Sequence, residues 1–400
     1  MSSVPARLRA FTAALAVGFA VLPLPAASAG DEAVPIAAGV TYRPFDLSTS
    51  HGPVRGHVIS VDLSDPHVDL GLLHPGSVAA KDEVTDLTNA RGAVAGVNGD
   101  FFNIAEEHPG IRPTSSSTGP EIAEGRALKG AVPDGQRFGP ALPAGTSNED
   151  VLALGADGRA RIAHLDLSGT AVGPRGTIGV AGLNQYALPV GGVGAFTDDW
   201  GTASRARAVC GTDEDRSAPC SERTEEVVVH RGVVESEADR PGTGPIPEDS
   251  VVLVGREQGA DELETLDAGD PVSVRTKLVP AEAPQLEFAV GATPILRDGA
   301  PLPGLDGELA PRTAAGISAD GRQVRLVVVD GRSEASTGMS LREVAELLTS
   351  FGATDGVNLD GGGSSTMAVR APGDDLATVR NVPSDGEQRQ VANGIGVFTH

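Results

Sequence analysis

The chain is short of basic residues and, beyond its N-terminus, of long apolar runs, and each shortage excludes a class of protein. After residue 29 no stretch approaches the roughly 20 consecutive apolar residues that a membrane-spanning helix needs. Acidic residues number 54 against 31 basic ones, so the surface repels phosphate backbones and anionic membranes. We therefore expect no nucleic-acid partner and no integral membrane span.

The motifs of two common hydrolase classes are also missing. The 8 histidines form no H-x-x-x-H or H-E-x-x-H pattern, so a zinc hydrolase is not predicted. No G-x-S-x-G sequence precedes a helix, and Ser364 stands before a strand-like segment, residues 366–369. A serine hydrolase is therefore poorly supported as well.

Only two cysteines occur, Cys210 and Cys220, and a polar segment separates them. In an exported protein such a close pair most simply forms a disulfide that closes a loop. The alternative is a metal-binding or redox pair, but the C-x-x-C spacing and a histidine nearby in the sequence are missing. We expect the disulfide.

The first 29 residues have the pattern of an export signal. Arg7 and Arg9 give a positive start, residues 11–24 are apolar, and residues 27–29 form a small-residue cleavage site. We expect a secreted, extracellular protein that begins at Gly30, with 29 basic and 54 acidic residues and a net charge of −25. The alternative is that the segment stays uncleaved as an anchor.

Short apolar runs separated by turn residues predict a strand-rich protein, with a short helix at residues 84–90. Residues 109–145 are rich in Pro, Gly and Ser and predict a loop or lid. From about 141 to 285 the pattern becomes many short strands with hairpin turns, as at Asp157-Gly158. We predict an α+β fold, a strand-rich mixed sheet with few helices, interrupted by an inserted mostly-β region. The predicted divisions are 1–29 signal, 30–140 N-terminal part, 141–285 insertion or accessory region, and 286–400 C-terminal part.

A strand-helix-strand unit is predicted at residues 322–360. The first strand ends in four aliphatic residues before Asp330, as in a strand buried on both faces. A helix starts at Ser340, which forms a capping box with Glu343, and Gly352 provides a helix C-terminus. Because such strands are usually parallel with a right-handed crossover, we expect Asp330 and Asp360 at the same edge of the sheet.

Three acids follow apolar strands: Asp100, Asp330 and Asp360. Ligands bind beyond the carboxyl ends of strands in open sheets, where carboxylates serve as general acids, bases, nucleophiles or metal ligands. For a single Asp-Gly pair the alternative is a plain turn, which we accept at Asp157 and Asp320. Asp330 differs because a long loop and a helix follow it.

Asp360 opens a run of three glycines, Gly361, Gly362 and Gly363, followed by Ser364 and Ser365. Consecutive glycines permit close approach of the backbone to a ligand, and their amides suit an anion such as phosphate. A flexible turn is an equal alternative for this segment alone. Arg312 and Arg332 offer guanidinium groups that bind phosphate through two hydrogen bonds, although an isolated arginine is more often a surface charge.

Six segments recur together in the order that the phosphodiester glycosidase family shows. They are residues 98–102 (NGDFF), 311–314 (PRTA), 329–332 (VDGR), 338–341 (GMSL), 358–365 (NLDGGGSS) and 381–386 (NVPSDG). The chain resembles this family over about residues 50–115 and 285–400. The stretch from about 140 to 285 matches no part of the pattern.

The resemblance implies hydrolysis of a sugar-1-phosphodiester at the bond between the anomeric carbon and the phosphate oxygen, so the expected partner is a glycan or sugar-1-phosphodiester. It implies Asp100 and Asp360 as catalytic carboxylates, with Asp330 third. The substrate-binding residues that it implies are Asn98, Arg312, Thr313, Arg332, Asn358, Gly361, Gly362, Gly363, Ser364, Ser365 and Asn381. A divalent cation is compatible with an acid cluster, but no ligand spacing requires one.

Two other functions remain open from the sequence. A carbohydrate- or phosphate-binding wall protein keeps the same scaffold without turnover. A metal-dependent phosphodiesterase uses the same acids as metal ligands and cuts the phosphorus–oxygen bond. Chelator sensitivity and release of a sugar 1-phosphate distinguish the phosphodiesterase from the glycosidase.

Overall fold

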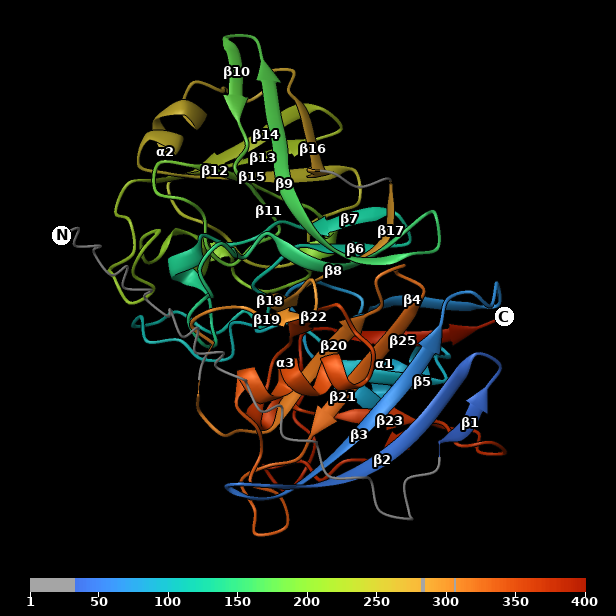
Figure 1. Cartoon of the computed structure of the whole chain (residues 1–400). Helices are drawn as coiled ribbons and strands as arrows, with labels where there is room; N and C mark the ends of the chain where they lie inside the picture. Colours follow the sequence, from blue (N-terminus) through green and yellow to red (C-terminus); the bar gives the residue numbers. More distant parts are fainter. Residues whose placement is uncertain (1–32, 282–284, 306) are drawn as a thin grey trace, which may run out of the picture.

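The computed structural model describes residues 33–281, 285–305 and 307–400 (Figure 1). The expected export signal, residues 1–29, lies outside these ranges. The described residues form four β-sheets with few helices, which confirms the strand-rich α+β class. Within them, no helix is both long and apolar enough to cross a bilayer.

The first sheet has eight strands in the order β1-β2-β3-β21-β20-β22-β18-β19. These strands are β1 (Val34–Ala37), β2 (Val40–Thr49), β3 (Gly52–Asp62), β18 (Thr293–Arg297), β19 (Ala300–Pro301), β20 (Arg312–Ile317), β21 (Gln323–Val329) and β22 (Asp355–Asn358). As predicted, β21 is buried on both faces: Val328 packs into one apolar cluster, and Val327 and Val329 pack into another.

The second sheet has five strands in the order β24-β23-β5-β25-β4. They are β4 (Val68–Leu73), β5 (Ala95–Asn98), β23 (Met367–Val369), β24 (Thr378–Val379) and β25 (Gly394–Thr399). Both sheets contribute to one apolar cluster, in which Val97 and Val397 join Val328 and Val357. The N-terminal and C-terminal parts of the chain are thus interleaved in both sheets.

Two helices cover the outer faces of these sheets. Helix α1 (Val84–Ala90), at the predicted residues, packs with strands of the second sheet, and helix α3 (Leu341–Ser350) packs on the first. Ser340 caps α3, and the predicted capping box with Glu343 is complete. Gly352 follows the helix at φ 86°, the left-handed geometry that glycine tolerates.

Strands β21 and β22 are parallel, as predicted, but they are not neighbours. Each pairs antiparallel with β20, which lies between them. Their carboxyl ends meet the same edge of the sheet about 10 Å apart, two strand spacings. Asp330 and Asp360 therefore lie at the same edge of the sheet, but the strands that they follow are not hydrogen-bonded to each other.

The other two sheets come mostly from the middle of the chain, in the upper part of Figure 1. One contains β6 (Glu121–Ala123), β7 (Arg126–Lys129), β8 (Asp150–Gly155), β9 (Ala160–Gly173), β10 (Gly176–Gly179), β16 (Ser273–Pro280) and β17 (Leu286–Gly291). The other contains β11 (Gly182–Leu183), β12 (Val193–Phe196), β13 (Thr224–His230), β14 (Val233–Ala238) and β15 (Ser250–Arg256), with α2 (Gln258–Leu263) nearby. Short 3-10 helices are η1 (Asp134–Gln136), η2 (Asp198–Trp200), η3 (Arg205–Val209) and η4 (Gly362–Ser364).

The structure changes one expectation about the chain around this region. Residues 109–145 are not one loop, because they contain the hairpin β6–β7 and η1. The middle region is mostly β as predicted, and it shares the main core: Leu152, Phe196 and Trp200 pack into the same apolar cluster as the first two sheets.

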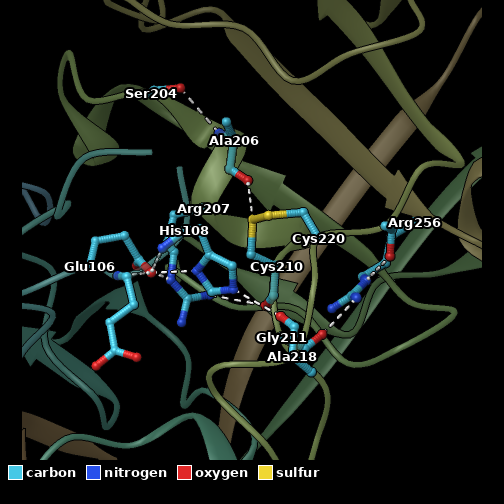
Figure 2. Close-up of a disulfide and its surroundings, with 12 residues drawn as sticks. Glu106, His108, Ser204, Ala206, Arg207, Cys210, Gly211, Ala218, Cys220 and Arg256 are labelled. Carbon is cyan, nitrogen blue, oxygen red and sulfur yellow. Dashed lines mark hydrogen bonds and ion pairs between the residues drawn. A yellow bond between two sulfur atoms is a disulfide. The ribbon is translucent and has the colours of Figure 1, made fainter. Parts of the chain in front are cut away.

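Cys210 and Cys220 form the predicted disulfide (Figure 2). Cys210 follows η3, and the bridge closes the polar loop between the two cysteines. His108 lies close to both sulfur atoms, a neighbour that the sequence spacing did not reveal. Its Nε2 donates to the Ala218 carbonyl at 2.8 Å, and its Nδ1 hydrogen-bonds with the Glu106 carboxylate.

Candidate functional site

Asp100 and Asp360 come together where the first two sheets meet. Asp100 follows β5 of the second sheet and Asp360 follows β22 of the first. The Asp360 amide donates to the Gly99 carbonyl at 2.8 Å, and the Asn98 side chain donates to the Asp360 carbonyl at 2.6 Å. Two acids 260 positions apart in the sequence are therefore fixed side by side through their backbones.

The Asp100 carboxylate is enclosed by backbone. Its Oδ1 accepts from the Phe101 amide at 2.8 Å, and its Oδ2 accepts from the Gly119 amide at 2.6 Å. A Cβ at Gly291 would overlap Oδ2, so this close approach requires glycine there. Burial raises the pKa of Asp100, opposed by the Gly119 amide and by the positive charges of Lys129 and Arg137.

A buried lysine supports the backbone around Asp100. Lys129 Nζ donates to the carbonyls of Thr118, Gly119 and Gly130 at 3.1, 2.9 and 2.6 Å. Burial lowers the pKa of Lys129 to about 8, while the charge of Glu121 opposes this change. Three carbonyl acceptors hold the ammonium group in place and fix the bend before β6 that presents the Gly119 amide.

Asn393 connects Asp100 to the buried Glu121, whose charge acts on Lys129. Its Oδ1 accepts from the Asp100 amide at 2.9 Å, and its Nδ2 donates to Glu121 at 2.8 Å. Burial raises the pKa of Glu121. The sequence analysis missed Lys129, Glu121 and Asn393 because no local motif links them.

Asp360 is the acid of this pair that keeps an accessible surface. Burial of the carboxyl group raises its pKa to about 7; Ser364 and Arg389 oppose the shift, and the nearby charge of Asp100 adds to it. A carboxyl with this pKa exchanges its proton at neutral pH, which suits acid–base catalysis.

Two arginines lie against the glycine run. A Cβ at Gly362 would stand 3.2 Å from Arg332 Nη1, and one at Gly363 would overlap Arg389. Arg389 Nη2 pairs with Asp385 at 2.6 Å, and its Nη1 lies 3.4 Å from Ser364 Oγ. Glycine here lets two guanidinium groups approach the backbone, and the Asp385 carboxylate that pairs with Arg389 lies equally close to Gly363. Arg332 was predicted and Arg389 was not.

Several residues predicted to bind substrate instead hold the loops of the site. Asn98 Oδ1 accepts from Thr313 Oγ1 at 2.7 Å and from the Thr366 amide at 3.0 Å. Asn381 donates to the Ser365 carbonyl at 2.9 Å. Arg312 donates to the carbonyls of Met339 and Glu308 at 2.9 and 2.6 Å.

Two predicted residues keep hydrogen-bonding groups without partners. Both polar atoms of the Asn358 side chain and the Ser365 hydroxyl are buried and make no hydrogen bond to any described residue. Buried polar groups are normally satisfied by protein, water or ligand. These groups are therefore available to a ligand or to ordered water.

Asp330 belongs to a neighbouring cluster. It accepts from the Val382 amide at 2.9 Å, and its Oδ2 lies 3.9 Å from His57 Nε2. His57 Nδ1 lies 2.9 Å from the Tyr42 hydroxyl, and burial lowers the pKa of His57 to about 4. Burial raises the pKa of Asp330, which the Val382 amide and the Asn381 side chain oppose. Asn381 connects this cluster to the serines that follow the glycine run.

The acids do not form a ready set of metal ligands. Among the described residues, the one group of three potential ligands whose atoms lie within 4.8 Å of one another is His108, Cys210 and Cys220. The two cysteines are bonded to each other, so they offer no thiolate to a metal. Both oxygens of Asp100 already accept hydrogen bonds from the backbone.

The fold and site define a strand-rich α+β protein in which two apposed carboxyl groups lie beside an arginine-flanked glycine run. A model of the phosphodiester glycosidase family matches residues 223–398, which confirms the family resemblance over the C-terminal part of the chain. The matched family is described as one of phosphodiester glycosidases. The matched range begins inside the region expected to be an insertion.

Solved structures share the fold. A hypothetical protein from Synechocystis has a TM-score of 0.70 and 19% identity over 93% of this chain and 64% of its own, so the chain spans about two thirds of that protein. A putative exported protein from Burkholderia pseudomallei has a TM-score of 0.66 and 25% identity, covering 86% and 74%. The zebrafish N-acetylglucosamine-1-phosphodiester alpha-N-acetylglucosaminidase catalytic domain, auto-inhibited by its pro-peptide, has a TM-score of 0.45 and 14% identity, covering 92% and 87%, a similarity too weak to support an inference. No curated protein sequence matches significantly.

Proposed function

We propose that this chain is a secreted glycosidase that hydrolyses sugar-1-phosphodiesters in a wall, capsule or exopolysaccharide component. The observation that carries the proposal is the pairing of Asp100 with Asp360, whose pKa is raised to about 7, beside a glycine run contacted by Arg332 and Arg389. An acid–base group and an anion-binding region adjoin each other, as cleavage of a bond between sugar and phosphate requires.

Asp360 is the group that meets the reacting atoms, because Asp100 is enclosed and both of its oxygens are occupied. The ionised Asp360 takes a proton from water as that water attacks the anomeric carbon. The carbon–oxygen bond breaks, and its electron pair stays on the phosphate. A phosphomonoester, with a second pKa of about 6, leaves without full protonation. Arg332 and Arg389 stabilise its charge.

Export rests on two observations. The first 29 residues have the charge, apolar run and cleavage site of a signal peptide. The similar protein of Burkholderia pseudomallei is described as a putative exported protein. The disulfide agrees with an oxidising compartment.

The test is product analysis on purified residues 30–400 with a panel of sugar-1-phosphodiesters, with and without chelator. We expect free reducing sugar and a phosphomonoester. Asp360→Asn should lower kcat/KM at least about 100-fold, because general base catalysis contributes 10²–10⁴-fold. The exposed Asp166→Asn serves as the matched control.

Two outcomes would contradict the proposal. Saturable binding without turnover of any substrate would indicate a binding protein. Release of a sugar 1-phosphate in a chelator-sensitive reaction would indicate a phosphodiesterase.

A further inference from the structure

The loop closed by the disulfide, residues 210–220, packs against the segment 134–138. The Gly135 amide donates to the Asp213 carbonyl at 2.9 Å, and the Gln136 side chain donates to the Thr212 carbonyl. A Cβ at Gly135 would overlap Asp213 and Glu214, so the two backbones touch directly. We call residues 210–220 the disulfide loop.

Two arginines fasten this contact, one within the disulfide loop and one just before it. Arg216 Nη1 donates to the Arg137 carbonyl at 2.7 Å, and its Cζ lies 4.0 Å from the centre of the Phe138 ring. Arg207 donates to Gln136 Oε1 at 2.9 Å. It also donates to the Cys210 carbonyl at 3.0 Å (Figure 2). The position of segment 134–138 is thus set by groups on either side of the bridge.

Arg137 extends from this segment to the candidate active site. Its guanidinium Cζ lies 5.5 Å from the centre of the Phe101 ring, and its charge acts on Asp100. Nη1 donates to Asn148 at 3.0 Å and Nη2 donates to Thr293 at 3.1 Å. Within the part of the chain that the structure describes, Nε is buried without a partner. The two bonded nitrogens fix the plane of the guanidinium next to the residue that follows Asp100.

We infer that the disulfide loop positions Arg137, and that Arg137 is a positioning residue that holds the Asp100 side of the active site in its working arrangement. This inference rests on the proposed function and deepens it. An arginine side chain loses rotamer entropy when it is ordered, so a rigid backbone beneath it favours the ordered state. The closed loop supplies that backbone.

A double-mutant cycle tests the coupling. Arg137→Gln should lower kcat/KM about 10–100-fold, mainly through kcat, which is less than the about 10²–10³-fold loss of a donor at the reacting atoms because Arg137 acts through other residues. Arg137→Lys, which keeps the charge, should recover part of the loss. Replacement of both cysteines by serine should lower kcat/KM about 3–10-fold, and adding it to Arg137→Gln should change little. If the fold-losses of kcat/KM from the two changes multiplied in the combined variant, the two sites would be independent and the inference would be overturned. The exposed Arg231→Gln is the control.

A second measurement does not depend on turnover. Amide hydrogen exchange of a peptide covering residues 132–140 should be faster in the double serine variant than in the wild type, with no change in a peptide from α3. Arg216→Ala leaves the disulfide intact and should also make exchange in residues 132–140 faster. This variant replaces the double serine variant if that variant fails to fold. Unchanged exchange in residues 132–140 would overturn the positioning role. Absence of turnover in the wild type would instead contradict only the proposed function.

Discussion

Asn98 and Asn358 occupy the same place in two similar sequences, each two positions before an aspartate that follows a strand. The structure gives them different surroundings. Asn98 makes three hydrogen bonds that join β5, β20 and the loop after Asp360. Asn358 makes none with the described residues. One asparagine holds the site together, and the other is left for a ligand or for water.

Substitution of Asn98 should therefore affect mainly stability, and substitution of Asn358 should affect mainly substrate binding. Asn98→Ala should lower the free energy of unfolding by about 2–4 kcal/mol, because three buried partners lose a hydrogen bond. Asn358→Ala should change it by less than about 1 kcal/mol and should raise KM. Urea unfolding and steady-state kinetics check both. Equal losses of stability would contradict this distinction.

Asp360 should make stability depend on pH. In the unfolded chain this group ionises near pH 3.9, whereas in the folded protein its pKa is about 7. Its stabilising contribution is complete below pH 4 and is lost as the pH rises through 7. Asp360→Asn should therefore gain stability relative to the wild type between pH 4 and pH 8, on the order of 1–4 kcal/mol. Thermal unfolding at both pH values measures this. A constant difference at the two pH values would show that the pKa is not raised.

The sequence alone predicted site residues at Asp100, Asp360 and Arg332, because each follows a strand in a recognisable local motif. It did not identify Arg389, Lys129 or Arg137. Lys129 is buried among backbone carbonyls from separate segments, and no local pattern distinguishes it from a surface lysine. Residues whose role depends on contacts between distant segments need the fold to be known.

At the scale of elements, α3 was predictable because its signals are local. Ser340 and Glu343 are three residues apart, and both hydrogen bonds of the capping box form. The pairing of β20 with β21 agrees with the turn predicted at Asp320. The pairing of β20 with β22 was not predictable, because antiparallel pairing over distant residues leaves no mark in either strand. The hairpin β6–β7 was missed for a related reason: strands of three and four residues are too short to show a pattern.

Removal of the side chain that caps α3 should measurably lower the stability of the protein. Ser340→Ala should lower the free energy of unfolding by about 1 kcal/mol, because the Glu343 amide loses its acceptor. Ser64→Ala, at an exposed turn, is the control and should have no comparable effect. Urea unfolding compares them. No loss in the Ser340 variant would mean that the capping box adds nothing to stability.

At the scale of the whole molecule, the middle region was expected to be an insertion or accessory region. In the structure it packs against the rest of the chain, because β8 pairs with β17 and Leu152, Phe196 and Trp200 lie in the shared core. Sequence analysis found the β character of this region but not its packing, since burial against distant strands is a property of the assembled fold.

Excision of residues 141–285 should therefore leave no folded protein. The deletion removes a partner of β17 and opens the main core, and each large buried side chain lost costs about 3–5 kcal/mol, against a total stability of about 5–15 kcal/mol. Circular dichroism and size-exclusion chromatography check this outcome. A folded and active deletion variant would restore the accessory role.

The most direct test of the account is the position of bond cleavage, measured by hydrolysis of a sugar-1-phosphodiester in ¹⁸O-labelled water. Attack on the anomeric carbon leaves the phosphomonoester with its original oxygen atoms and places the label in the sugar. We predict an unlabelled phosphomonoester from the wild type and no product above background from Asp360→Asn. Label in the phosphate would show that the phosphorus–oxygen bond is cut, and would contradict the glycosidase mechanism.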